Sequence, residues 1–357
     1  MDTTHPAPDG PPPGLEEHLA AAALYRLAFG FMPAQMIHVA ARLRIPDLLA
    51  EGPRTATELA KLTGSDARAL HRVLRGLVAF DVLAEPEAGT FELTLSGRLL
   101  RSDVPNSVRP MLMPYFDEGI WGAWGALSAT VRTGGPALEQ VRGVSLFDYL
   151  AQQPAVSSEF NEAMALSARL EAPAVALAHD FARYRTAVDL GGGNGTLMAN
   201  LLAAHPQLRG TLFDTPTGLA EAPSVLAAHG VADRCEIAVG DFFASVPDGA
   251  DVYLLKSVLH DWDDEQCIRI LRNCRGAVPA DGRLLVVEVV MPERMTAQTD
   301  HFSVISDINL LATTSGRERT AEEFRRILTA GGFEPAGIGD PIGFTGYRII
   351  EAVPAAH

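Results

Sequence analysis

From Thr186 onward the chain alternates between short apolar segments and segments with helical spacing, and this alternation restricts the possible fold more than any other feature. The apolar segments that read as strands are residues 186–190, 210–214, 235–241, 251–256 and 283–290. Strands that alternate with helices form a mostly parallel sheet with helices on both faces. The sequence therefore predicts an α/β, Rossmann-like domain over residues 181–357, with an antiparallel edge formed by two strands within 333–353.

The residues before this domain have a different pattern. Residues 1–14 are rich in proline and are interpreted as a disordered tail. Apolar residues at three- and four-residue spacing over 15–50 predict helix, and two short helices follow, the second capped by Ser65. A hairpin over 81–94 completes a pattern typical of a winged helix. We expect a helical, winged-helix domain over residues 15–105, then a helical region that lines the substrate site over residues 106–180.

Because winged helices also occur in DNA-binding proteins, the charge of this domain matters. Residues 54–101 carry seven arginines and lysines against six acidic residues, and the whole chain has a net charge of −15. A surface of that charge repels nucleic-acid phosphates. The charge balance favours a module that joins two chains, and a transcription factor is kept as a rival hypothesis.

The sequence also bears on location and redox state. It has no apolar run long enough to span a bilayer, and its N-terminus lacks the order of a signal peptide. Its three cysteines, Cys235, Cys267 and Cys274, have no metal-ligand spacing and are expected to be buried thiols. These features predict a cytoplasmic protein without a membrane partner.

A glycine-rich turn, VDLGGGNG at residues 188–195, follows the first strand. Glycine lets the backbone approach a ligand closely, and the next helix presents its N-terminus to the same space. Nicotinamide cofactors need glycine or alanine at the sixth position of their motif, where this chain has Thr196. A carboxylate before the turn would repel a pyrophosphate but suits a cationic sulfonium group. The turn therefore favours S-adenosylmethionine, bound through Asp189, Gly191, Gly193 and Gly195.

Two more acids come at the ends of later strands. Asp214 ends the second strand, where a carboxylate can accept both ribose hydroxyls. Asp241 ends the third strand, where it can accept from the adenine amine while Phe242 covers the ring. Three acids at three successive carboxyl ends of a parallel sheet predict a cofactor crevice.

His260 follows the fourth strand, on the same rim as the cofactor loops. Methyl transfer to a hydroxyl needs a base, and the pKa of histidine suits that task. Glu288, at the end of the fifth strand, and Glu318 are candidates to orient the imidazole or the acceptor hydroxyl. No metal is expected, because the histidine replaces a Lewis acid. Asp261 and Trp262 are expected on the cofactor side.

Together these segments resemble a known family. The run LKSVLHDWDDEQC, with VDLGGGNG, FDTP and GDFF before it and VVEVV and GRERT after it, is similar to the plant-type and bacterial small-molecule O-methyltransferases over residues 24–353. The resemblance implies an N-terminal domain that dimerises, and His260 as base with Glu288 and Glu318 beside it. The cofactor residues that it implies are Gly191, Asp214, Asp241, Phe242 and Lys256. Ser257, beside Lys256, is also counted with the cofactor residues, although plant members often carry an aromatic residue at that position. The acceptor residues that it implies are Phe160, Met164, Asn309 and Thr313.

The sequence therefore predicts a homodimeric, S-adenosylmethionine-dependent O-methyltransferase that methylates a hydroxyl of an aromatic or polyketide-like molecule. We expect a role in secondary metabolism such as antibiotic biosynthesis, with S-adenosylhomocysteine as product and no nucleic-acid partner. Besides the transcription factor, two alternatives stay open. One is a relative on the same scaffold that does not methylate, such as a hydroxylase, decarboxylase or cyclase, and the other is a C- or N-methyltransferase.

Overall fold

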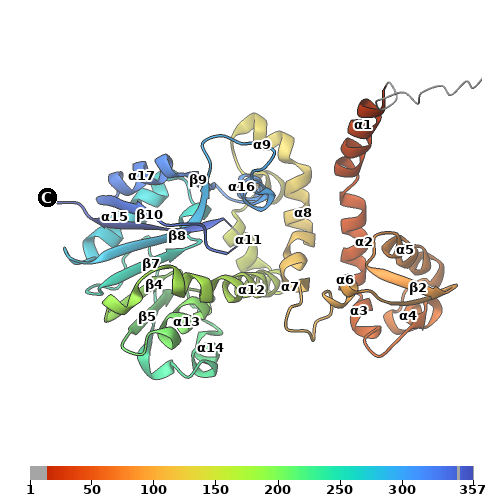
Figure 1. The fold of residues 1–357 in the computed structure, drawn as a ribbon, viewed down its shortest axis with the longest axis horizontal. Coiled ribbons are helices and arrows are strands. Elements are labelled where there is room, and N and C mark those ends of the chain that lie inside the picture. The colour runs from red at the N-terminus through yellow and green to blue at the C-terminus, as the bar shows by residue number, and fades with distance from the viewer. Residues whose placement is uncertain (1–13, 344–345, 357) are drawn as a thin grey trace, which may run out of the picture. The chain divides into compact units, whose positions relative to one another are not determined.

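The computed structural model describes residues 14–343 and 346–356 (Figure 1). The chain divides into two compact units, of which the first ends at Phe116 and the second begins at Asp117. The tail predicted at 1–14 lies outside the described residues except for Gly14, which precedes the first helix. Among the described residues, no helix is both long and apolar enough to cross a membrane.

The first unit is built from short helices around a small sheet. Its helices are α1 (Leu15–Ala28), α2 (Phe31–Arg42), α3 (Ile45–Leu48), α4 (Ala56–Thr63), α5 (Ala67–Ala79), α6 (Leu95–Arg98) and α7 (Arg109–Leu112), followed by the 3₁₀ helix η1 (Met113–Phe116). The antiparallel sheet has the order β1-β3-β2, with β1 (Arg54–Thr55), β2 (Leu83–Glu87) and β3 (Thr90–Leu93). Leu59, Leu74 and Phe91 are fully buried in its core. The two helices α4 and α5 and the following hairpin lie where the sequence predicted them.

The start of α5 differs by one residue from the prediction. Its N-cap is Asp66, whose Oδ1 accepts from the Ala69 N–H at 2.8 Å. The Ser65 hydroxyl accepts from the Thr63 hydroxyl at 2.9 Å and is engaged with the preceding helix. Serine and aspartate both cap helices well, so two neighbouring candidates cannot be ranked from sequence alone. The prediction of Ser65 as the cap was wrong.

The second unit contains a large sheet. Its strands are β4 (Thr186–Leu190), β5 (Arg209–Asp214), β6 (Cys235–Val239), β7 (Val252–Lys256), β8 (Arg283–Met291), β9 (Arg319–Thr320), β10 (Phe333–Ile338) and β11 (Tyr347–Pro354). The order is β10-β11-β8-β7-β4-β5-β6, and β9 pairs with the end of β8. Pairs from β8 to β6 are parallel, whereas β11 is antiparallel to both of its neighbours. This confirms the predicted mostly parallel sheet with an antiparallel edge.

Helices cover both faces of this sheet (Figure 1). One hydrophobic core is shared with α12 (Pro154–Ala178), α13 (Thr196–Ala204) and α14 (Ala222–Ala228), and the other with α15 (Asp264–Ala277) and α17 (Ala321–Ala330). Leu254 and Leu255 are neighbours in β7 and pack into different cores, because successive strand residues point to opposite faces. Thr320 and Glu323 form the predicted capping box at the start of α17.

The remaining helices of this unit form a cluster of their own. They are α8 (Glu118–Gly125), α9 (Leu127–Thr133), α10 (Ala137–Arg142), α11 (Leu146–Gln152) and α16 (His301–Thr313). Ile120, Leu138 and Ala312 share the core of this cluster, so α16 joins helices that lie far before it in the sequence. Short 3₁₀ segments occur at η2 (Phe181–Arg183), η3 (Ala232–Arg234) and η4 (Leu259–Asp261).

The strand order determines where a ligand can bind. From β4 the chain passes through β5 to β6 at one edge, and it then returns to β7 on the other side of β4. The loops after β4 and β7 therefore leave the sheet where the strand order reverses, which is where open α/β sheets bind ligands. The glycine turn follows β4 and His260 follows β7, so both predicted site segments lie at this point.

Candidate active site

The glycine turn follows β4 directly and leads into α13. Gly191, Gly193 and Gly195 have φ values of 69°, 55° and 78°, a conformation that residues with side chains rarely adopt. A Cβ atom on Gly191 would lie 2.8 Å from the Val258 side chain in the loop after β7. The absence of a side chain at Gly191 is therefore what allows these two loops to approach each other.

Asp189 lies at the end of β4, just before the turn, and is 1% exposed. Burial raises its pKa to about 7, and the charge of Asp214 acts in the same direction. Its Oδ2 accepts no hydrogen bond from the residues that the structure describes. A buried carboxyl oxygen without a donor, next to a turn of four glycines, fits a cationic group of the kind that S-adenosylmethionine carries.

The other two acids of the rim accept hydrogen bonds from backbone N–H groups. Asp214, the last residue of β5, accepts from the Gly193 N–H at 2.9 Å and from the Thr215 N–H at 2.6 Å. Asp241 follows β6 by two residues and accepts from the Phe243 N–H at 2.8 Å. Each carboxylate has lone pairs left for a further donor. Asp214 thus ties the end of β5 to the glycine turn.

Aromatic side chains gather beside the turn. The Trp262 indole stacks on Phe147 of α11 with ring centroids 5.3 Å apart and meets Phe243 edge-on at 4.8 Å. Phe242 lies edge-on to the same indole at 6.3 Å, and one of its ring carbons is 3.6 Å from where a Cβ of Gly191 would be. These rings form an apolar wall of the kind that a purine ring stacks against.

Lys256 and Ser257, at the end of β7, are engaged with other protein groups. Lys256 Nζ lies 2.7 Å from Glu171 Oε2 of α12 and 4.7 Å from the ring centroid of Tyr347. Ser257 has a φ of 53°, and its hydroxyl forms a 2.7 Å hydrogen bond with the Tyr347 hydroxyl. The two side chains therefore join β7 to α12 and β11, and a cofactor contact for them stays a prediction.

His260 lies in η4, directly after β7, and Glu288 of β8 holds this turn. Glu288 Oε1 accepts from the backbone N–H groups of Val258 at 3.0 Å and Leu259 at 2.9 Å. Its other oxygen, Oε2, lies 3.5 Å from His260 Nδ1. Glu288 is fully buried. Through its two oxygens it holds both the backbone of the turn and one edge of the imidazole.

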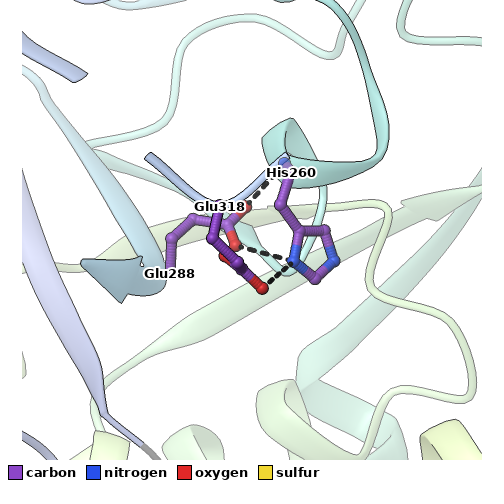
Figure 2. A group of neighbouring side chains, drawn as sticks. All are labelled: His260, Glu288 and Glu318. Carbon is purple, nitrogen blue, oxygen red and sulfur yellow. Dashed lines mark hydrogen bonds and ion pairs between the residues drawn. The ribbon is translucent and has the colours of Figure 1, made fainter. Parts of the chain in front are cut away.

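Glu318 reaches the same edge of the ring from another segment. Strand β9 begins one residue later and pairs with the end of β8, which brings Glu318 close to Glu288. Glu318 Oε1 lies 3.2 Å from His260 Nδ1 and accepts from the Ser306 hydroxyl at 2.7 Å. Figure 2 shows both carboxylates at one edge of the imidazole, with the other ring nitrogen directed away from them.

The carboxylates around the imidazole dominate its protonation. Burial lowers the pKa of His260, but the charges of Glu288, Glu318 and Asp261 outweigh this effect and raise it to about 10. Burial raises the pKa of Glu288 to about 7 and that of Asp261 to about 6. These groups share protons in one buried cluster, and the negative charges stabilise the protonated form of the imidazole. Shifts of this kind are typical of catalytic sites.

The same cluster is the one group of possible metal ligands found among residues 14–343 and 346–356. His260, Glu288 and Glu318 each offer a ligand atom, and these atoms lie within 4.8 Å of one another. Glu288 Oε1 is already engaged with two backbone N–H groups. When both of its ring nitrogens are protonated, the imidazole carries one positive charge, which partly balances the two buried carboxylates.

The four residues expected near the acceptor differ in what they can offer. Met164 of α12 is 43% exposed, and Phe160 of the same helix packs against the α8–α11 cluster. Asn309 of α16 accepts from the Trp124 indole N–H at 3.1 Å through its side-chain oxygen. Thr313 is 2% exposed and donates to the backbone carbonyl of Asn309, which makes it a poor candidate for a ligand contact.

Several residues that support the cluster were not found from the sequence. Asp307 accepts from the Glu318 N–H at 3.0 Å, next to Ser306 on α16. The pair of adjacent polar residues, Ser306 and Asp307, lies in the middle of α16 and is the available sequence signal for such a role. The others, whose contacts cross long stretches of sequence, are Gly316 and Arg319. Glu171, the partner of Lys256 on the neighbouring rim, was also not found.

Two family models match the chain. The O-methyltransferase domain matches residues 124–334, and the O-methyltransferase dimerisation domain matches residues 25–103. O-demethylpuromycin-O-methyltransferase of Streptomyces alboniger is 38% identical over 364 residues, covering 98% of this chain and 96% of the relative.

Solved structures agree with this match. The N,N-8-amino-8-demethyl-D-riboflavin dimethyltransferase RosA of Streptomyces davawensis has a TM-score of 0.80 at 35% identity, over 94% of this chain and 99% of that one. The O-methyltransferase NcsB1 from neocarzinostatin biosynthesis, in complex with S-adenosylmethionine and 2-hydroxy-5-methyl naphthoic acid, has a TM-score of 0.79 at 32% identity, over 90% and 95%. The chain belongs to the family of S-adenosylmethionine-dependent O-methyltransferases.

Proposed function

We propose that the protein methylates a hydroxyl of an aromatic or polyketide-like small molecule in secondary metabolism, with His260 as the general base. The observation that carries this proposal is that both carboxylates lie at the same edge of the imidazole. Glu288 and Glu318 hold the Nδ1 edge, and Nε2 is directed away from both (Figure 2). Nδ1–H can then donate to the carboxylates, which leaves the Nε2 lone pair for the proton of the acceptor hydroxyl.

The acceptor class is supported by the relatives. One is named for O-demethylpuromycin, and another, from neocarzinostatin biosynthesis, was crystallised with a naphthoic acid. We extend this class, and a role in antibiotic biosynthesis, to the present chain. The match to a dimerisation domain supports a homodimer. A cytoplasmic location stays a prediction from the sequence.

The cofactor site is proposed from the groups at the strand ends. When bound, S-adenosylmethionine supplies an activated methyl group on a sulfonium. The residues proposed to hold its amino-acid end are Asp189, Gly191, Gly193 and Gly195. Asp214 is proposed to bind the ribose, and the adenine is assigned to Asp241, Phe242 and Trp262. Lys256, Ser257 and Asp261 complete the proposed set.

The function is tested by incubating the protein with S-adenosylmethionine and a panel of hydroxylated naphthoates, phenazines and quinones. We expect at least one acceptor to gain one methyl group, with one S-adenosylhomocysteine formed per product molecule, as measured by mass spectrometry. An acceptor that is converted without gaining a methyl group would instead identify a non-methylating member of the same scaffold.

Methylation of an amine is the second candidate, because a structural relative is named as an N,N-dimethyltransferase. An aromatic amine has no acidic proton to lose before it attacks, so its methylation depends less on a base. Matched pairs of acceptors that differ only in a hydroxyl or an amine distinguish the two candidates. NMR of the product identifies the methylated atom.

Chelation is expected to leave the reaction unchanged. The proposed mechanism uses the His260 imidazole as base and no bound cation, so removal of divalent cations takes nothing from it. Turnover should be the same after dialysis against EDTA and after later addition of Mg²⁺ or Zn²⁺ at low concentration. Loss of turnover that returns with one particular ion would show that His260, Glu288 and Glu318 hold a metal.

A further inference from the structure

The turn that carries His260 is held by a buried guanidinium. Arg319 is completely buried and donates from Nη1 to the Leu259 carbonyl and from Nη2 to the Trp262 carbonyl, both at 2.8 Å. Its Nε and Nη2 also donate to Asp264 Oδ1, at 3.0 and 2.8 Å. The two carbonyls lie on either side of His260 in the sequence, so one side chain holds both ends of the turn.

The residues just before Arg319 close on the same turn. A Cβ atom on Gly316 would lie 1.8 Å from the backbone oxygen of His260 and 2.5 Å from the carbonyl carbon of Asp261. These distances leave no room for a side chain at Gly316. Two residues later, Glu318 approaches His260 Nδ1. The segment 316–319 therefore holds the backbone of the base and also delivers the carboxylate that orients its ring.

The chemistry of the two carbonyls favours an arginine. The planar guanidinium presents its donors in a rigid fork, whereas a lysine ammonium is a single charge on a flexible stem. The Cys267 thiol also lies 3.1 Å from the Leu259 carbonyl, but a thiol is a weak donor. The Leu259 carbonyl also accepts from the Trp262 N–H at 3.3 Å, a bond within the turn itself. The fork is thus the group that ties both carbonyls of the turn to Asp264.

We infer that Arg319 is a positioning residue for the methyl transfer: its guanidinium fixes the turn so that His260 Nδ1 stays on Glu318 and Nε2 stays directed at the acceptor. The inference rests on the proposed role of His260 as base. General-base catalysis depends on distance and direction, and a displacement of about 1 Å can cost roughly 10²-fold in rate. Arg319 touches neither the acceptor nor its proton, so its effect is exerted through the backbone of the turn.

The experiment compares Arg319→Lys with the matched control Arg317→Lys. Arg317 also binds Asp264, at 2.9 Å, but it is 43% exposed and its other ion pair is with Glu323. In Arg319→Lys, we expect kcat to fall by about 10²-fold while the KM of the acceptor and the Kd of S-adenosylmethionine stay close to those of the parent. Arg317→Lys should keep the parent kcat.

A readout at the ring itself separates positioning from loss of stability. At a pH alkaline enough for the imidazole to be neutral, the ¹⁵N shifts of His260 should report one tautomer with a proton on Nδ1 in the parent and a mixture in Arg319→Lys. The control should match the parent. Equal losses of kcat in both variants, or an unchanged kcat in a folded Arg319→Lys protein, would overturn the inference.

Two further variants keep the test decisive. If Arg319→Lys does not fold, Asp264→Asn takes its place, because it weakens the hydrogen bonds of the guanidinium to residue 264 and keeps Arg319 itself. Asp264 is half exposed, and its variant should show a smaller fall in kcat. An unchanged kcat in Asp264→Asn would reject the inference. His260→Ala is measured in parallel. If His260→Ala turns over normally, the proposed base is wrong, whereas an inactive His260→Ala beside a normal Arg319→Lys refutes the positioning role alone.

Discussion

Replacing His260 with alanine is expected to lower kcat by about 10²–10⁴-fold, because the acceptor hydroxyl then loses the base that removes its proton. The Kd of S-adenosylmethionine should change little, since the glycine turn and the aromatic wall keep their residues. Release of S-adenosylhomocysteine gives kcat, and calorimetry gives the affinity. Turnover equal to that of the parent would remove His260 from the mechanism.

The pH profile sharpens this prediction. Only the neutral imidazole can accept a proton, so kcat/KM of the parent should rise with pH as His260 is deprotonated. The raised pKa of His260 places this rise on the alkaline side of neutrality. In His260→Ala the residual rate should instead follow ionisation of the acceptor itself. His229→Ala, which removes an exposed histidine after α14, is the matched control and should keep the parent profile.

Removing Glu171 is expected to lower the free energy of unfolding by about 3–5 kcal/mol, because it leaves the buried Lys256 ammonium without its partner. The two side chains are only 6% and 10% exposed, and their charged atoms are 2.7 Å apart. The Ser167 hydroxyl, which donates to Glu171 Oε1 at 3.0 Å, would also lose its acceptor. Urea unfolding of Glu171→Ala, followed by tryptophan fluorescence, measures the change. All three tryptophans lie in the second unit.

An exposed ion pair supplies the control for this measurement. Glu322 and Arg325 form a pair on α17 in which both side chains are about half exposed. Exposed ion pairs are screened by water and contribute little to stability, so Glu322→Ala should unfold at nearly the same urea concentration as the parent. If Glu171→Ala unfolds at the same urea concentration as Glu322→Ala, the buried pair does not stabilise the unit.

The sequence was most informative at the ends of strands. Asp189, Asp214 and His260 were found because parallel strands deliver their carboxyl ends to one edge, and the structure places them on that edge. Glu288 was also found, as a carboxylate at the end of the segment RLLVVE, although the strand continues beyond it to Met291. These predictions depend on local pattern and on one topological rule, both of which a single sequence carries.

Contacts between distant segments were harder to predict. Nothing in the pattern shows that Lys256 pairs with Glu171, which lies in a helix before the sheet begins. The two hydrogen bonds of Arg319 to turn carbonyls are equally hidden, because a carbonyl has no sequence signature. Thr313 was assigned to the acceptor from resemblance, whereas its hydroxyl is used within its own helix.

The position of β11 in the sheet has a consequence for how the protein is made. Residues 347–354 lie between β8 and β10, so the free edge of β8 is not covered until these residues leave the ribosome. Tyr347, which contacts Ser257 beside the turn of the base, arrives at the same time. During synthesis the glycine turn and His260 are therefore made before the sheet that positions them is complete. A ribosome stalled before residue 347 should carry a second unit that is sensitive to protease, because an unpaired inner strand leaves its core open.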